Sequence, residues 1–143
     1  MTSNLKGIQN MKLARRDVYR QIGRFRTDLG SLNAFETVAY GPSSKGSNSI
    51  AGRRECISGA QLKRASSNTR QGKWLASLAC WVGRTIGQPI SILEVGTCAG
   101  ISGSYLLAGM SEANGGRLIT FEGSPEIAEL ARKNETFAQF SHR

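Results

Sequence analysis

The chain has 143 residues, a length typical of one domain with its own hydrophobic core. Hydrophobic residues make up 39% and charged residues 20% of the chain, which indicates a globular protein and excludes one that is disordered throughout. No apolar run approaches the roughly 18 residues that a membrane span needs, and residues 1–10 lack the apolar core of a secretory signal, so we expect a cytoplasmic protein that does not enter a membrane.

The charge of the chain is divided unevenly. Residues 1–70 contain 13 Lys and Arg against 4 Asp and Glu, whereas residues 71–143 contain 6 of each kind, so the net charge of +9 lies entirely in the first half. A basic arm of this kind can bind nucleic acid or an anionic surface, or it can be a solvated face that keeps the protein soluble. We favour the solvated face, because aromatic residues are not interleaved with the cations as a base-stacking surface requires.

Metal binding and a disulfide framework are both poorly supported. The cysteines, Cys56, Cys80 and Cys98, are odd in number and match no zinc-binding spacing. The single histidine, His142, lies one residue from the end. The sequence therefore predicts no metal site.

The first half predicts a helix, a strand and a loop. Residues 11–29 form an amphipathic helix, because their apolar members recur at intervals of four, three and four: Val18, Ile22, Phe25 and Leu29. Residues 35–40 have the composition of a short strand. Residues 41–54 are rich in Gly, Ser and Asn, which predicts a mobile loop.

A second helix is predicted over residues 69–84, with Ser67, Asn68 or Thr69 as its cap. Its apolar face is made of Leu75, Leu78, Ala79 and Val82. Trp74 and Trp81 lie on the flank of this helix, where we expect them to pack in the core rather than to bind a ligand. The run from Gly87 to Pro89 ends the helix.

The segment that carries chemistry follows as strand, helix, strand and helix. Residues 90–95 are a β-branched-rich run that stops at a glycine, as a buried parallel strand does. A turn over residues 96–100 leads into a helix over residues 101–110, in which Gly103 and Gly109 indicate close backbone packing. Residues 117–122 form the next strand, and Ser124 and Pro125 begin another helix as cap and first residue. A unit of about 30 residues fits a right-handed parallel crossover.

This unit has the features of a site for an anion and a ribose. Gly96 and Gly100 let the backbone approach a ligand, and the following helix start offers N–H groups and partial positive charge to an anion. Glu122, at the carboxyl end of the second strand, can accept both hydroxyls of a ribose. We therefore expect a ligand that contains adenosine.

Glu94 selects among such ligands. Dinucleotide-binding domains present Gly-x-Gly-x-x-Gly directly after an apolar strand, with no acid close to the pyrophosphate. Here the pattern is Glu94-x-Gly96-x-x-x-Gly100, and an anion at position 94 repels a pyrophosphate but attracts an ammonium. S-adenosylmethionine has an amino-acid end with both charges, so its carboxylate can face the helix while its ammonium faces Glu94.

At residues 92–102 and 116–126 the sequence resembles the class I S-adenosylmethionine-dependent methyltransferases, and most closely their O-methyltransferase-like branch. The resemblance implies an α/β fold with a Rossmann-like parallel sheet, incomplete here. Residues 1–68 would be a basic helical leader with a flexible loop, and residues 69–143 the first part of the cofactor-binding domain.

The resemblance also implies a role for each site residue. Gly96, Thr97 and Gly100 would form the turn, and Ser102 would bond the methionine carboxylate. Glu94 would orient the ammonium, Glu122 would bind the ribose, and Gly123 directly after it completes the predicted cofactor site.

The implied activity is methyl transfer, to the oxygen of a small-molecule acceptor. The catalytic base, the acceptor and the oligomeric state are not assigned, because only two of the seven strands expected of the family are recognisable. Two alternatives stay open: a non-catalytic remnant or interaction module with a methyltransferase-like fold, and an NAD-type dinucleotide-binding domain that uses Gly100 and Gly103 in a variant glycine loop.

Overall fold

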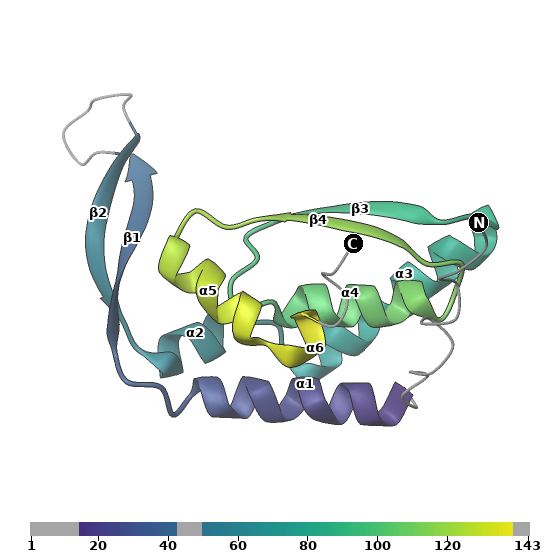
Figure 1. The fold of residues 1–143 in the computed structure, drawn as a ribbon, viewed down its shortest axis with the longest axis horizontal. Helices are drawn as coiled ribbons and strands as arrows, with labels where there is room; N and C mark the ends of the chain where they lie inside the picture. The colour runs from purple at the N-terminus through teal and green to yellow at the C-terminus, as the bar shows by residue number, and fades with distance from the viewer. Residues whose placement is uncertain (1–14, 43–49, 139–143) are drawn as a thin grey trace, which may run out of the picture.

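The computed structural model of the protein describes residues 15–42 and 50–138 (Figure 1). The helices are α1 (Arg15–Leu29), α2 (Gly59–Ala65), α3 (Thr69–Ile86), α4 (Ile101–Ser111), α5 (Pro125–Lys133) and α6 (Glu135–Ala138). The strands are β1 (Phe35–Pro42), β2 (Ile50–Ile57), β3 (Ile90–Val95) and β4 (Gly116–Phe121). Figure 1 shows α4 between the β3–β4 sheet and α1, so the molecule has an α/β layered arrangement.

The predicted first helix is confirmed as α1. Val18, Ile22 and Leu29 are buried, as the apolar spacing predicts, while residues 11–14 lie outside the described part of the chain. Arg26 connects α1 to α2 and to the chain that follows α2, because its guanidinium donates to the carbonyls of Lys63 at 3.0 Å and Ser67 at 2.9 Å.

The segment after α1 is a β-hairpin. β1 confirms the predicted strand and pairs with β2 in an antiparallel register that runs from Phe35 opposite Ile57 to Pro42 opposite Ile50. The predicted loop over residues 41–54 is therefore wrong at both of its ends, and residues 43–49 lie outside the described chain. Pairing with β1 satisfies the backbone of β2, a long-range contribution that local composition does not reveal.

The predicted second helix is confirmed as α3, and α2 precedes it. Both helices begin with a capping box. In this motif the side chain of the cap residue accepts a hydrogen bond from the backbone N–H three residues later, and the side chain of that later residue accepts one from the backbone N–H of the cap. Ser58 pairs in this way with Gln61 in α2, and Asn68 pairs with Gln71 in α3. Gly87 ends α3 with a φ of 76°. The sequence prediction missed α2, although Ser-x-x-Gln is a recognisable start signal.

The buried face of α3 is made of small residues: Gly72, Ala76, Ala79, Cys80 and Gly83. A Cβ on Gly109 of α4 would collide with the Ala76 carbonyl oxygen, and one on Gly72 would collide with the Tyr105 ring. This close approach confirms the packing role predicted for Gly109. It leaves no room for large side chains, so the predicted core position of Trp74 and Trp81 is wrong: each is 64% exposed.

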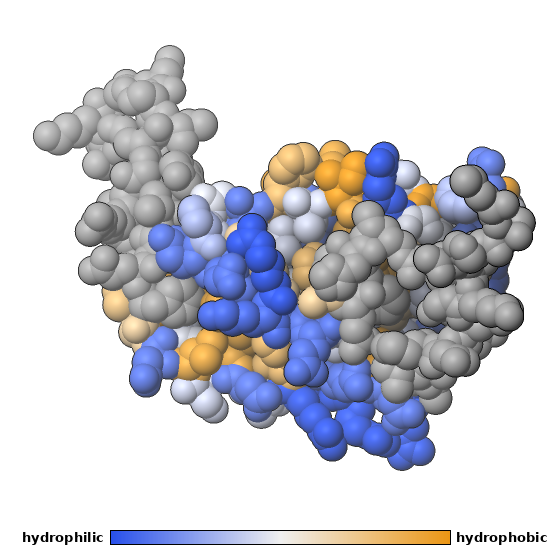
Figure 2. Space-filling model, in the orientation of Figure 1, coloured by the Kyte–Doolittle hydropathy of each residue, from blue (hydrophilic) through white to orange (hydrophobic). Residues whose placement is uncertain are grey.

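β3 and β4 form a parallel pair joined through α4, with Ile90 opposite Gly116 and Val95 opposite Phe121. Alternate side chains of the sheet face α3 and α4, and the opposite face exposes Leu93, Val95, Ile119 and Phe121. Figure 2 shows hydrophobic surface over this sheet. The sequence predicts a strand buried on both faces, whereas β3 is buried on one face among the described residues.

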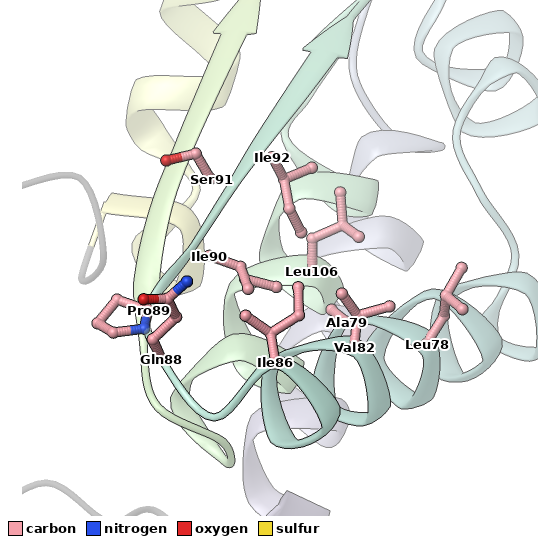
Figure 3. A pocket seen from close by; sticks show the side chains of 10 residues that line it. All are labelled: Leu78, Ala79, Val82, Ile86, Gln88, Pro89, Ile90, Ser91, Ile92 and Leu106. Atoms are coloured by element: carbon pink, nitrogen blue, oxygen red, sulfur yellow. The ribbon is translucent and has the colours of Figure 1, made fainter.

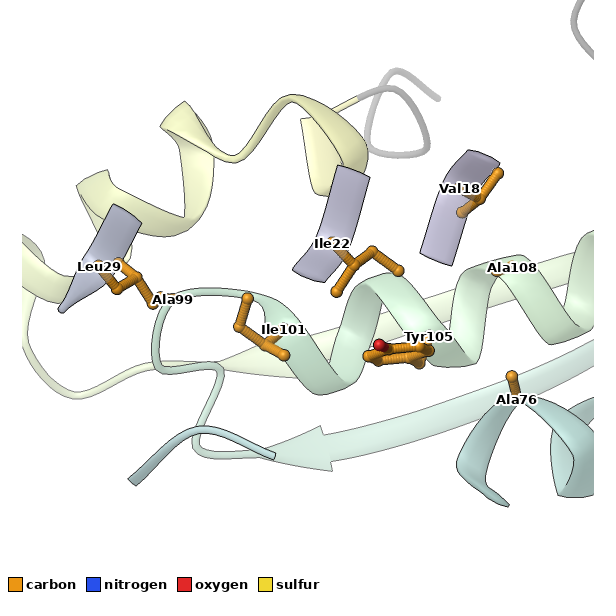
Figure 4. Close-up of a cluster of buried hydrophobic side chains, with 8 residues drawn as sticks. All are labelled: Val18, Ile22, Leu29, Ala76, Ala99, Ile101, Tyr105 and Ala108. Carbon is orange, nitrogen blue, oxygen red and sulfur yellow. The ribbon is translucent and has the colours of Figure 1, made fainter. Parts of the chain in front are cut away.

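The largest buried cluster joins α1 to the turn and helix that follow β3. Figure 4 shows Val18, Ile22 and Leu29 of α1 beside Ala99, Ile101, Tyr105 and Ala108. The Tyr19 and Tyr105 rings lie 5.2 Å apart, centroid to centroid, in a tilted arrangement. The basic helix therefore contributes to the same core as the β3–α4 unit.

Asn134 fastens α5 and α6 to that unit. Its side chain is fully buried and donates to the Ala99 carbonyl at 3.1 Å and to the Ser104 hydroxyl at 3.4 Å, while it accepts from the Phe137 N–H at 3.2 Å. The predicted start of α5 is confirmed, with Ser124 as cap and Pro125 as first residue. No helix in the described ranges is long and apolar enough to cross a membrane.

Candidate cofactor-binding site

The turn after β3 is anchored to the end of β4. The N–H groups of Gly96 and Thr97 both donate to the Phe121 carbonyl, at 2.9 Å and 3.0 Å. Gly96 and Gly100 have φ values of 89° and 74°, in the left-handed region that favours glycine. The turn therefore has a defined shape before any ligand is bound.

The two glycines of the motif have different surroundings. A Cβ on Gly96 would meet nothing within 4 Å, whereas one on Gly100 would lie 2.9 Å from the Phe137 ring. Gly96 therefore faces open space, where a ligand can approach the backbone. Gly100 makes room for Phe137, a packing role that the sequence interpretation did not include.

The start of α4 offers unsatisfied hydrogen-bond donors. Gly100 is its N-cap, and it has no side chain with which to cap the helix. The first N–H groups of a helix have no acceptor within the helix, and they carry its partial positive charge. This helix start can therefore bind an anionic group such as a carboxylate.

Glu94 lies beside that helix start. Its carboxylate accepts hydrogen bonds from the hydroxyls of Ser102 at 2.6 Å and Thr120 at 2.8 Å, and the Thr120 hydroxyl also bonds with that of Thr97. No Lys or Arg among the described residues pairs with Glu94. Its negative charge is thus held in place by neutral groups and remains available to a cation.

Glu122 crosses from the end of β4 to the turn. One oxygen of its carboxylate accepts the Cys98 N–H at 2.8 Å, and the other accepts the Ser124 N–H at 3.0 Å. Each oxygen keeps a further lone pair for a hydroxyl donor. The carboxylate is half-buried, and Gly123 beside it is exposed.

The structure thus brings most of the predicted site residues together around one turn. Glu94 and Ser102 touch directly, and Thr97 connects to Glu94 through Thr120. The sequence analysis missed Thr120, which lies opposite Glu94 in the parallel register. Thr120 lies two residues before Glu122, and residues two apart in a strand point to the same face. This spacing was a signal in the sequence, but only the strand register shows that Thr120 lies opposite Glu94.

A separate apolar hollow of about 490 Å³ lies between α3 and the first half of β3. Figure 3 shows Leu78, Val82 and Ile86 facing Ile90, Ile92 and Leu106 across it. This hollow is at the opposite end of β3 from Gly96, so it is distinct from the predicted cofactor site. Within the described ranges, no group of three His, Cys, Asp or Glu residues is placed to hold a metal ion.

Comparison with known proteins gives one informative relationship. The chain is 37% identical over 75 residues to a catechol O-methyltransferase of Mycobacterium tuberculosis (strain ATCC 25618 / H37Rv). This distant match supports an O-methyltransferase-like relationship. It covers 52% of this chain and 31% of the relative, so the chain spans less than a third of the length of the methyltransferase that it matches. No protein-family profile and no solved structure matches the chain.

Proposed function

We propose that the β3–α4–β4 unit binds S-adenosylmethionine as part of a class I methyltransferase that acts on the oxygen of a small molecule. One observation carries the proposal. Two carboxylates, Glu94 and Glu122, stand at the ends of neighbouring parallel strands on either side of a helix start that Gly100 leaves without a side-chain cap. The catechol O-methyltransferase match over 75 residues supports the same reading.

The charges at the turn favour an amino-acid end over a pyrophosphate. The start of α4 attracts an anion, but the Glu94 carboxylate beside it is within hydrogen-bond distance of Ser102 in the first turn of that helix. A pyrophosphate would bring its charges against this carboxylate, whereas an α-amino acid offers a carboxylate and an ammonium together. The charge of Glu94 therefore disfavours the NAD-type alternative.

The amino-acid end and the ribose of S-adenosylmethionine each have residues suited to them. The N–H groups at the start of α4 would hold the methionine carboxylate, and Glu94 would hold the ammonium. Ser102 now donates its hydroxyl to Glu94, so a bond from Ser102 to the carboxylate would need that hydroxyl to rotate. Glu122, already oriented by two backbone N–H groups, would accept the ribose hydroxyls, and Gly96 leaves open space for the ligand.

The bound cofactor supplies a methyl group on a positively charged sulfur. The part played by this chain is to position that cofactor, because methyl transfer depends largely on aligning the acceptor with the sulfonium.

Thermal unfolding with added ligands tests the proposal. We expect S-adenosylmethionine and S-adenosylhomocysteine to raise the melting temperature and NAD to leave it unchanged. At a hundredfold excess over Kd, a ligand of the native state adds about 2.7 kcal/mol to the free energy of unfolding. A shift with NAD alone would contradict the proposal.

A second candidate function is a non-catalytic interaction module with a methyltransferase-like fold. The observation that favours it is the exposed apolar sheet face, on which Leu93 is 66%, Val95 83% and Phe121 58% exposed. A protein that melts at the same temperature with all three ligands would favour this second function.

A further inference from the structure

A basic groove lies between α1 and α3, away from the turn after β3. Its lining includes Arg15, Arg16, Tyr19 and Arg20 from α1, and Lys73 and Ser77 from α3. The hollow measures about 690 Å³. Hydrophilic side chains also gather along α1 at the lower edge of Figure 2. Four cations from two helices therefore converge on one concave surface.

Acidic residues balance only part of this charge. Arg15 pairs with Glu112 at 3.2 Å, and Arg20 pairs with Asp17 at 3.1 Å. Arg15 is also held in place by hydrogen bonds to the hydroxyls of Tyr19 at 2.8 Å and Ser77 at 3.3 Å. Arg16 and Lys73 have no acidic partner within the described ranges. Each of these two cations can therefore bind an anion without breaking an ion pair.

Aromatic side chains border the groove on the outer side of α3. Arg70, Trp74, Ser77 and Trp81 recur at intervals of four, three and four, so they lie along one side of the helix. Ser77 also lines the groove, so this side of α3 adjoins it. Trp74 and Trp81 are each 64% exposed. Two exposed aromatic rings therefore lie on the side of α3 that adjoins the cationic groove.

We propose that this surface binds single-stranded nucleic acid, with phosphates held by Arg16 and Lys73 in the basic groove and bases stacked on Trp74 and Trp81. Cationic grooves that follow a backbone, bordered by aromatic rings on which bases stack, are the usual means of binding single strands. Duplex bases are stacked inside the helix and offer no open ring faces. The exposed tryptophan rings beside the cations favour a nucleic acid over other polyanions, because bases have ring faces that stack on tryptophan.

Tryptophan fluorescence tests the proposal directly, because Trp74 and Trp81 are the two tryptophans of the sequence. An oligothymidylate of about 15 nucleotides should quench the tryptophan fluorescence of the full chain, and rising salt should weaken the binding. The affinities of variants are then measured by the fluorescence anisotropy of the labelled oligothymidylate.

Charge-reversal variants distinguish binding at the groove from attraction to the overall charge of the protein. Lys73→Glu and Arg16→Glu should each weaken oligothymidylate binding about tenfold or more. Lys133→Glu, an equal charge change at an exposed position of α5, should change it less than about twofold. Equal losses in all three variants would overturn the proposal, because they would show attraction to net charge alone.

Ring removal separates base stacking from phosphate binding. Trp74→Ala should weaken oligothymidylate binding by about fivefold or more, and should leave binding of heparin, a polyanion without bases, unchanged. An unquenched fluorescence, or equal effects of Trp74→Ala on both ligands, would overturn the stacking role. Binding to phosphatidylserine vesicles in place of oligothymidylate would overturn the choice of nucleic acid.

Discussion

Glu94 and Glu122 are both acids at the ends of strands, yet their surroundings differ. Hydroxyl groups surround Glu94, and backbone N–H groups hold Glu122. Hydroxyls can rotate when a ligand arrives, whereas backbone donors are fixed by the turn. Glu94 is therefore suited to exchange partners with an incoming ammonium, and Glu122 to present lone pairs in a constant direction.

Asn134 is fully buried and connects α5 and α6 to the turn and helix that follow β3. Asn134→Ala should lower the free energy of unfolding by about 1–3 kcal/mol, because the buried Ala99 carbonyl loses its donor. Urea unfolding measures this difference. Asn114→Ala is the matched control, since Asn114 is exposed and donates only to the Gly83 carbonyl. Equal losses in the two variants would contradict the anchoring role of Asn134.

Among the elements, α3 and α4 approach each other closely because small residues line their contact. Gly109→Ala should destabilise the protein by about 1–3 kcal/mol, because the added methyl group would collide with the Ala76 carbonyl and force the helices apart. Gly23→Ala, in a helix position with nothing within 4 Å, should stabilise it by about 0.4–1 kcal/mol. Urea unfolding of both variants checks the opposite signs, and a neutral Gly109→Ala would contradict the close packing.

The elements with a local signal are the ones that could be predicted. Three such signals depend only on residues close together in the sequence, and the structure confirms the prediction made from each. They are the apolar spacing of α1, the glycine that ends α3 and the cap at Ser124. β2 depends on pairing with β1, and the exposure of Trp74 depends on which face of α3 the rest of the protein covers. Neither can be read from a window of sequence, because a distant segment determines it.

In the candidate site, too, some features follow from the local sequence and others depend on distant segments. Glu94, Gly96 and Glu122 could be chosen from their spacing, because glycine and acidic residues at strand ends have a direct chemical meaning. The contact of Thr120 with Glu94 and the packing of Phe137 on Gly100 required the strand register and the position of α6. The sequence therefore indicates which residues gather at the candidate site but not which residues support them.

At the scale of the whole molecule, one core joins three segments that are far apart in the chain. α1, the β3–α4 unit and α6 meet around Tyr105, Ile22 and Phe137, so the basic helix and the candidate cofactor turn belong to one packed body. The basic groove lies on the outer side of this body, and the cofactor turn lies at the end of its sheet.

We propose that the charge of Glu94 makes the turn after β3 a site for S-adenosylmethionine. Calorimetric titration of the full chain with S-adenosylhomocysteine tests it most directly, because this ligand has the same amino-acid end. Glu94→Gln keeps the shape of the side chain and one accepting oxygen, but it removes the charge and replaces the other oxygen with an NH2 donor. It should weaken binding about tenfold or more. Glu129→Gln, on the surface of α5, should bind like the unchanged protein. Absence of binding, or equal affinity in Glu94→Gln and the unchanged protein, would contradict the account.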